Sequence, residues 1–293
     1  MKKGDDLGMP IIFIGMHRSG TSLLGRLLED LGLFVGAKKD ENNEALFFLE
    51  LNSWLMAQCG ARWDNPEQIE YFWQPEAKEV LSASKNYVSS LMQSPRAARY
   101  LGKKRYFREK SVLTQKNPWG WKDPRNTFTL PFWLSLFPDA RIVFIERHGV
   151  DVAQSLRLRA EKSISLTTQR YAKAKSIVWL RPKKGGFSDS PRSLSLEGGF
   201  SLWESYQREA TKNLESLRPE QVFRVRYEDL LAEPQQILKD AAEFCGLAVT
   251  DEGVQEITES INPSRAYSYR KSEELCKFAE SNCRKLGNWG YKP

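Results

Sequence analysis

The sequence is poor in residues that hold metals or build disulfide frameworks. Its 293 residues include two histidines and four cysteines, and no two cysteines have C-x-x-C spacing. We therefore expect no metal site and reduced thiols. No apolar run approaches the roughly 18–20 residues that span a bilayer. The N-terminal stretch MKKGDDLGMP also lacks the apolar core of a signal peptide. These absences favour a cytoplasmic protein without a transmembrane segment.

Positive charge is in excess, with a formal net charge of +7. Lysine and arginine cluster in residues 157–186. A basic surplus suits an anionic partner, such as a nucleotide or an acidic glycan. Residues 183–199 are rich in glycine, serine and proline and are predicted to form a long loop. The basic stretch lacks a recognisable nucleic-acid-binding module, so we expect no nucleic-acid partner.

Buried strands alternate with amphipathic helices along the chain. The predicted strands are residues 10–15, 119–122, 141–147 and 222–231. The predicted helices are residues 21–32, 44–59 and 76–93, one opened by Pro131, one from about Asp151 and one near Pro234. This alternation predicts an α/β protein with a P-loop NTPase-like, three-layer αβα fold around a central parallel sheet.

A glycine-bracketed loop follows the first predicted strand. Residues Gly15 to Ser22 read G-x-x-x-x-G-T-S, which is the frame of a P-loop directly before a helix. Backbone N–H groups in such a loop bind phosphate oxygens at the helix N-terminus. Thr21 occupies the position where a nucleotide triphosphatase has lysine, and the available cation, Arg18, lies inside the loop. The loop is thus better suited to a nucleotide without a γ-phosphate.

A second candidate anion site follows the strand at 141–147. Arg147 ends that strand, and Ser155 lies eight residues later in the following helix. Ligands of open α/β sheets bind at the carboxyl ends of the strands. A guanidinium there suits a second phosphate group, although an arginine paired with an acid at a strand end is an equally simple interpretation.

These two motifs together resemble the P-loop sulfotransferases. The segment GMHRSGTSLL is similar to their 5′-phosphosulfate loop, and RIVFIERHGVDVAQSL to their 3′-phosphate motif. The segments GWKDPR and RYEDLLAEP resemble those of the bacterial and tyrosylprotein or carbohydrate branches. The resemblance implies a single sulfotransferase domain over residues 1–293. It places the nucleotide-binding core at about 9–36, 117–160 and 220–247, with acceptor-facing insertions at about 37–116 and 160–200.

The resemblance also implies the reaction and its ligands. The expected donor is 3′-phosphoadenosine-5′-phosphosulfate (PAPS), used without a metal, and the acceptor is a hydroxyl of a carbohydrate or small molecule. The residues expected to hold the 5′-phosphosulfate are His17, Arg18, Ser19, Gly20, Thr21 and Ser22. Arg147 and Ser155 are expected to hold the 3′-phosphate.

For the chemical step, the family position of a catalytic lysine falls on Lys122, and Arg18 is expected to assist it. The cytosolic branch has a histidine two residues later, where this chain has Pro124, which cannot accept a proton. Other branches use a glutamate downstream of the P-loop helix. We expect Glu44 to be the base; the alternatives are Glu41, Asp40 and His17.

The sequence is also compatible with two other functions. One is a P-loop nucleotide kinase, although Thr21 and the lack of an evident acidic strand end of the Walker-B type argue against it. The other is a non-catalytic binder of anionic glycans that uses the basic stretch at 157–184.

Overall fold

The structure, a computed structural model, describes residues 9–180 and 185–293. Most of the N-terminal stretch and the start of the predicted 183–199 loop, including Lys183 and Lys184, lie outside the described residues. The chain divides into two compact units. The first comprises residues 1–146 and 206–266, and the second comprises residues 147–205 and 267–293. The single-domain expectation stays a prediction.

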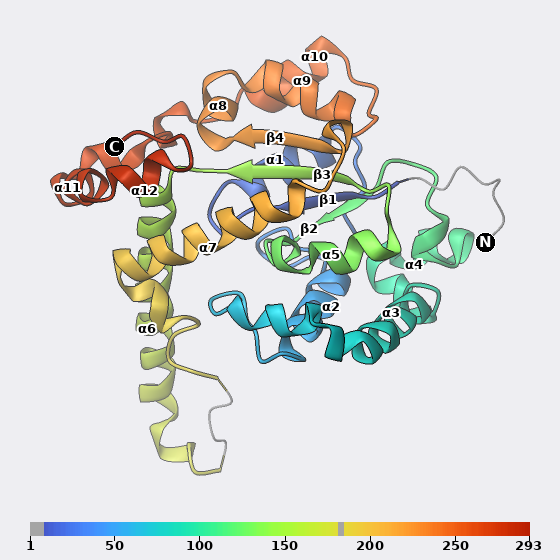
Figure 1. The fold of residues 1–293 in the computed structure, drawn as a ribbon, viewed down its shortest axis with the longest axis horizontal. Coiled ribbons are helices and arrows are strands. Elements are labelled where there is room, and N and C mark those ends of the chain that lie inside the picture. The colour runs from blue at the N-terminus through green and yellow to red at the C-terminus, as the bar shows by residue number, and fades with distance from the viewer. Residues whose placement is uncertain (1–8, 181–184) are drawn as a thin grey trace. The chain divides into compact units, whose positions relative to one another are not determined.

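The first unit is built on a four-stranded parallel sheet in the order β2-β1-β3-β4 (Figure 1). The strands are β1 (Ile11–Ile14), β2 (Gly120–Lys122), β3 (Arg141–Glu146) and β4 (Val222–Arg226). Every residue of β1 is buried, as expected for a central strand that is covered on both faces. The predicted α/β fold with a central parallel sheet is confirmed.

Alternate residues of the strands face two helical layers. Phe13, Val143 and Val225 pack with apolar residues of α1 (Thr21–Asp30) and α9 (Pro234–Phe244) in one buried cluster. On the other face, Trp121 stacks on Phe48 of α2 (Leu46–Ala57), with 3.9 Å between ring centroids. Figure 1 shows α9 on one side of the sheet and α2 on the other. The sheet therefore lies between two helical layers.

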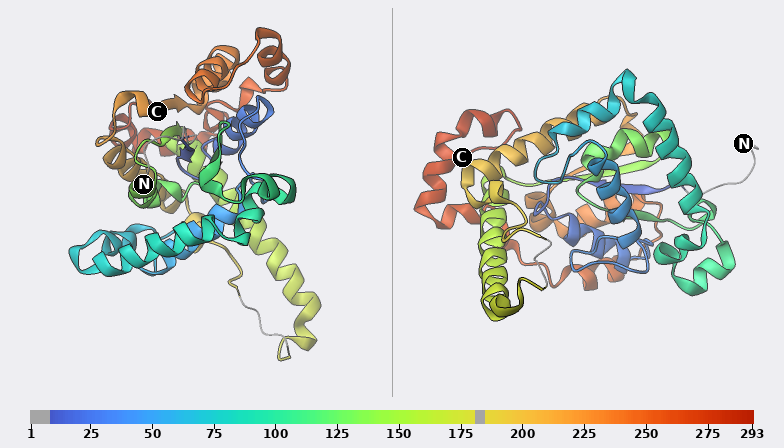
Figure 2. Two further views of the ribbon diagram at one scale, coloured as in Figure 1. Left: turned by 90° about the vertical axis from the view of Figure 1, so that its right-hand side faces the viewer. Right: turned by 90° about the horizontal axis from the view of Figure 1, so that it is seen from below.

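The remaining helices complete the two units. Those of the first unit are α3 (Lys78–Met92), α4 (Ala98–Glu109), α5 (Asn126–Leu136), α8 (Tyr227–Ala232) and α10 (Asp251–Thr258). The second unit contains α6 (Gly149–Ala174), α11 (Glu273–Ser281) and α12 (Cys283–Gly287). Helix α7 (Leu196–Leu214) begins in the second unit and ends in the first. Figure 2 gives two further views of these elements.

The prediction that Pro131 opens a helix is wrong, because α5 begins at Asn126 and contains Pro131. A proline inside a helix leaves the carbonyl four residues earlier without its usual N–H donor. Here that carbonyl belongs to Thr127, and the Asn213 side-chain amide donates to it at 2.9 Å. A distant polar side chain thus satisfies the carbonyl, which the local sequence does not indicate.

Two further boundaries also differ from the predictions. The strand predicted at 222–231 ends at Arg226, and α8 follows with Glu228 and Asp229 in its first turn, where acids favour a helix start. The loop predicted at 183–199 is wrong at its C-terminal end, because α7 begins at Leu196. A Cβ added to Gly199 would lie 3.1 Å from Ala153 Cα, so this glycine permits close helix packing.

No helix in the described part of the chain is both long and apolar enough to cross a membrane. The described residues likewise contain no cluster of three or more His, Cys, Asp or Glu side chains arranged to hold a metal ion.

Candidate active site

The loop between β1 and α1 has the conformation that its two glycines permit. Gly15 and Gly20 have φ values of +131° and +99°. A Cβ on Gly15 would lie 2.3 Å from the Ile145 carbonyl oxygen, and one on Gly20 would lie 2.3 Å from Cδ2 of Tyr227. Larger residues at either position would therefore force the loop away from β3 or α8.

Hydrogen bonds inside the loop fix its path. The Ser19 hydroxyl donates to the Met16 carbonyl at 2.6 Å, and the Gly15 N–H donates to the Thr127 hydroxyl at 3.0 Å. Among the described residues, no side chain caps the start of α1. The first N–H groups of a helix lack intrahelical acceptors and attract anions. Arg18 is exposed on the loop with a φ of +69°.

Three predicted site residues from distant parts of the sequence meet beside this loop. Lys122 at the end of β2 places its Nζ 3.1 Å from the Ser22 hydroxyl and 3.1 Å from Glu44 Oε1. The Ser22 hydroxyl donates to the Asn42 carbonyl at 2.8 Å. Lys122 and Glu44 are 2% and 3% exposed. A cation and a carboxylate are therefore held together in a dry environment at the start of α1.

Glu44 is in a setting that favours its protonated form. Burial, reinforced by the nearby Asp123 carboxylate, raises the pKa of Glu44 to about 7 despite the opposing effects of Lys122 and Arg125. Arg125 Nη1 lies 3.3 Å from Glu44 Oε2. Glu44 lies two residues before α2 rather than opening it. A carboxyl group with this pKa can exchange a proton near neutral pH.

The other candidates for the base are placed differently. Asp40 Oδ1 accepts the backbone N–H groups of Asn42 and Glu44 at 2.9 and 2.8 Å, so its carboxylate holds the turn. Glu41 is exposed. His17 is buried, with its ring centroid 4.8 Å from that of Trp63. Of these four, Glu44 has its carboxylate within hydrogen-bonding distance of Lys122 Nζ, at 3.1 Å.

A buried polar network beneath the site was not anticipated from the sequence. Asn52 on α2 donates to Asp123 Oδ2 at 2.8 Å and to the Asn126 side chain at 2.7 Å. The other Asp123 oxygen accepts two bonds from Arg125 at 3.0 Å. Asn126 in turn donates to the Phe13 carbonyl. This network fixes the strand end that carries Lys122. The available signal was the single asparagine of the mostly apolar helix LFFLELNSWLMA.

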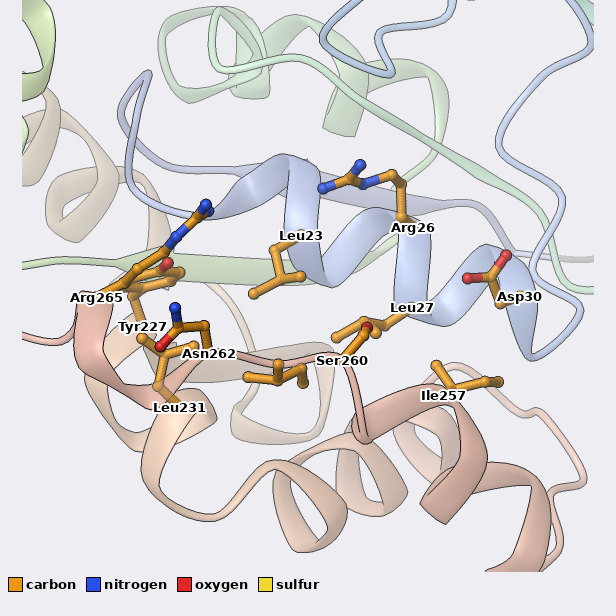
Figure 3. A pocket seen from close by; sticks show the side chains of 11 residues that line it. Leu23, Arg26, Leu27, Asp30, Tyr227, Leu231, Ile257, Ser260, Asn262 and Arg265 are labelled. Atoms are coloured by element: carbon orange, nitrogen blue, oxygen red, sulfur yellow. The ribbon is translucent and has the colours of Figure 1, made fainter.

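A pocket of about 320 Å³ lies along the side of α1. Figure 3 shows Tyr227, Asn262 and Arg265 gathered at the end near Leu23, with Asp30 at the opposite end. Because the Tyr227 ring lies directly against Gly20, this end of the pocket adjoins the glycine loop. No local sequence pattern indicates this pocket, because its lining residues are far apart in the sequence.

The second unit contains Arg147 and Ser155. Arg147 Nη2 lies 3.5 Å from Asp151 Oδ2, and Asp151 accepts bonds from the Ser268 hydroxyl at 2.7 Å and the Tyr269 N–H at 2.8 Å. Asp151 therefore pairs with the Arg147 guanidinium and links the first turn of α6 to residues 268–269. Ser155 lies further along α6. Their assignment to the 3′-phosphate stays a prediction.

The C-terminal segment packs against the start of α6 within this unit. The His148 ring stacks on Tyr269, with 4.3 Å between centroids, and its edge contacts Tyr291. Its Nε2 lies 3.0 Å from the Lys292 carbonyl oxygen. Burial lowers the pKa of His148, so the neutral ring is favoured and serves in packing.

The fold and the glycine loop define a P-loop-type α/β protein. Comparison with known protein families identifies the family within this class. The model of the sulfotransferase family matches residues 10–251, and the chain belongs to that family. The resemblance identified from the motifs is thereby confirmed. An uncharacterized protein of Aquifex aeolicus (strain VF5) is 24% identical over 280 residues. That match covers 93% of this chain, which spans only 31% of the relative's length.

Several solved structures are also similar. The sulfotransferase domain from the curacin biosynthetic pathway has 16% identity and a TM-score of 0.49, covering 94% of this chain and 98% of that one. The sulfotransferase from Alicyclobacillus acidocaldarius has 14% identity and a TM-score of 0.47, covering 97% and 96% of the two chains.

Proposed function

We propose that this protein transfers a sulfuryl group from PAPS to an acceptor hydroxyl, on a carbohydrate or another small molecule. The observation that carries the proposal is the contact of Lys122 with both Glu44 and Ser22, each at 3.1 Å. It joins a buried cation, a carboxyl group with a raised pKa and an anion-binding helix start. These are the parts that proton removal and sulfuryl transfer require.

The donor side of the proposal rests on the glycine loop. Thr21 replaces the lysine that neutralises a γ-phosphate, and PAPS has no γ-phosphate. We assign the backbone around His17 to Ser22 to the 5′-phosphosulfate, with Arg18 as an additional cation. The Ser19 hydroxyl donates within the loop, so its contribution is to loop shape. The pocket at Leu23, Tyr227 and Asn262 offers an apolar wall, an aromatic ring and an amide for the adenine base.

PAPS would supply a sulfuryl group attached to a phosphate leaving group. The proposed transfer uses no metal. Glu44 would take the proton from the acceptor hydroxyl while the oxygen of that hydroxyl forms its bond to sulfur. Lys122 would stabilise the negative charge that develops as the bond from sulfur to the bridging phosphate oxygen breaks. Arg125, itself held by Asp123, would orient Glu44. Glu44 accepts single bonds from Lys122 and Arg125, which leaves each carboxylate oxygen with further acceptor capacity.

Arg147 and Ser155 complete the proposal as ligands of the 3′-phosphate. The support is the motif resemblance together with the Asp151 contact that holds the guanidinium. An arginine held by an acid is pre-organised for bidentate binding of a phosphate. The cytoplasmic location predicted from the sequence is part of the same proposal.

The direct test is an acceptor screen with isotopically labelled PAPS, read by mass spectrometry. Pools of phenols, sugars, lipid headgroups and peptides are incubated with the wild type, Glu44→Gln and the exposed control Glu41→Gln. We expect a labelled sulfate ester in at least one pool with the wild type and Glu41→Gln, and loss of that product with Glu44→Gln. Equal product with all three proteins would show that Glu44 is not the base. Phosphorylated products from magnesium-ATP, with none from PAPS, would instead establish the kinase alternative.

A further inference from the structure

A second and larger pocket lies between α2, α3 and α4 in the first unit. Its volume is about 760 Å³, which falls within the range of pockets that bind drug-sized ligands. Its lining residues include neither Ser22, Glu44 nor Lys122. We call it the three-helix pocket.

The floor and one wall of the three-helix pocket are apolar. Phe47 and Leu51 of α2 form part of the floor and are each 5% exposed. Trp54 of α2 and Tyr87 of α3 lie side by side, with 4.9 Å between their ring centroids. Phe47, Leu51 and Trp54 line the pocket from one face of α2, whereas Phe48 and Asn52 face the core. The pocket thus offers an apolar surface that an alkyl chain or ring can cover.

The rim carries an excess of positive charge. Lys38, Arg96, Arg99 and Lys103 line the pocket together with one acid, Glu50. Glu50 Oε1 lies 2.7 Å from Arg99 Nη2, and the two side chains are 52% and 41% exposed. The charge of the lining is therefore complementary to an anion.

The wall formed by α4 is held in position by the rest of the unit. The helix is kinked at Gly102, where φ is +74°. The Tyr100 hydroxyl donates to the Gly120 carbonyl at 2.6 Å, and the Ala37 N–H donates to the Tyr100 carbonyl at 2.7 Å. Because Tyr100 is fully buried and bonded at both its hydroxyl and its carbonyl, this wall of the pocket is in place before any ligand arrives.

We propose that the three-helix pocket binds a small anionic amphiphile, with one carboxylate, sulfate or sulfonate head and an apolar body. The apolar body would cover Phe47, Leu51 and Trp54, and the head would lie among the guanidinium and ammonium groups of the rim. This is a binding site beyond the proposed transfer reaction and does not depend on it.

The Arg99–Glu50 ion pair leads to a specific prediction about anion binding. An anionic head must compete with the Glu50 carboxylate for Arg99. Removing the charge of Glu50 therefore releases the guanidinium and makes the rim more positive, so affinity for the anion rises. A pair with only a structural role would predict no gain in binding from the same substitution.

The experiment uses decanoate below its micelle concentration, titrated calorimetrically into the full-length protein. Decanol and decyltrimethylammonium are the neutral and cationic probes, and acetate is the head group without its apolar body. The variants are Glu50→Gln, Arg99→Gln and Trp54→Ala, with Glu79→Gln as a matched charge control outside the pocket lining. Thermal unfolding is used to check that each variant is folded.

We expect decanoate to bind with one site per chain, at least tenfold more tightly than decanol. Decyltrimethylammonium and acetate should show no saturable binding. Glu50→Gln should tighten decanoate binding about threefold to tenfold, and Arg99→Gln and Trp54→Ala should each weaken it at least fivefold. Glu79→Gln should leave it unchanged. Equal affinity for decanoate and decanol, or an affinity that none of the pocket variants alters, would overturn the proposal.

Discussion

Two buried glutamates in the first unit have different surroundings. Glu146 at the end of β3 accepts two hydrogen bonds from Arg224 at 2.8 and 3.0 Å and one from Gln207 at 3.0 Å. Glu44 accepts one bond from Lys122 at 3.1 Å and one from Arg125 at 3.3 Å, beside the Asp123 carboxylate. Their exposures are 2% and 3%, so burial alone does not distinguish them.

The difference lies in how the charge is compensated. The bidentate arginine and the amide together satisfy Glu146, as expected for a carboxylate that connects β3 to β4. Glu44 has single contacts and a neighbouring negative charge, so its protonated form is accessible near neutral pH. A buried acid at a strand end is therefore no sufficient sign of catalysis. Its partners decide which role it serves.

The largest expected effect is a difference in turnover between variants of Glu44 and Glu146. Glu44→Gln should lower turnover of an identified acceptor at least 100-fold, because general-base catalysis contributes about 10²- to 10⁴-fold. Steady-state kinetics measure this, and the affinity for 3′-phosphoadenosine-5′-phosphate (PAP), the product of PAPS, should change less than threefold. Glu146→Gln is the matched control and should retain turnover within threefold. Comparable losses in both variants would remove the distinction between the two residues.

The second prediction compares Glu146 with the residue that follows it. Arg147→Ala should weaken PAP binding at least tenfold while barely changing the affinity for adenosine 5′-phosphosulfate, which lacks the 3′-phosphate. Glu146→Gln should change neither affinity. Isothermal titration calorimetry provides both dissociation constants. A similar loss for the two ligands in Arg147→Ala would contradict the assignment of this arginine to the 3′-phosphate.

The third prediction concerns pH. Because the pKa of Glu44 is raised to about 7, the deprotonated base is depleted as pH falls below that value. The wild-type kcat/KM should therefore decline about tenfold for each pH unit well below 7 and level off above it. Initial rates between pH 5 and 9 test this. A profile flat down to pH 5 would show that Glu44 is not the base.

The remaining effects are on stability and have opposite signs. The pKa of Glu44 is raised from 4.5 to about 7, so the folded state binds more protons than the unfolded state between these values. Wild-type stability should consequently fall as pH rises through this window, by about 3 kcal/mol at most, and Glu44→Gln should abolish this loss.

Glu146→Gln should instead destabilise the protein by about 1 kcal/mol at neutral pH, because it weakens a charge-assisted pair whose arginine is half exposed. Urea unfolding at pH 5 and pH 8 compares the two variants. Destabilisation of Glu44→Gln at pH 8 to the same extent as Glu146→Gln would mean that Glu44 is also mainly a structural ion-pair partner.

The features predicted from the sequence are those that local patterns encode. The all-apolar strand at Ile11–Ile14, the glycines at 15 and 20 and the leucine stripe of α1 are contiguous, so the glycine loop and the parallel sheet could be predicted. Lys122 and Glu44 were selected through family resemblance. Their mutual contact across 78 positions is a property of the fold.

The features that were missed depend on long-range contacts. Asn213 satisfies the carbonyl freed by Pro131, and Asn52 supports Asp123 across 71 positions. Gly199 lies inside a helix, at a position where the backbone of Ala153 approaches closely. Local composition cannot reveal that contact. The pocket beside α1 combines Leu23 with Tyr227 and Asn262, which are far apart in the sequence.

Ligand choice by the glycine loop tests the central claim most directly. Calorimetry and thermal unfolding are carried out with PAP in the presence of EDTA, and separately with magnesium-ATP. The account predicts that PAP binds without metal and, at 100 times its dissociation constant, stabilises the protein by about 2.7 kcal/mol, whereas magnesium-ATP has no effect. Binding of magnesium-ATP without binding of PAP would contradict it.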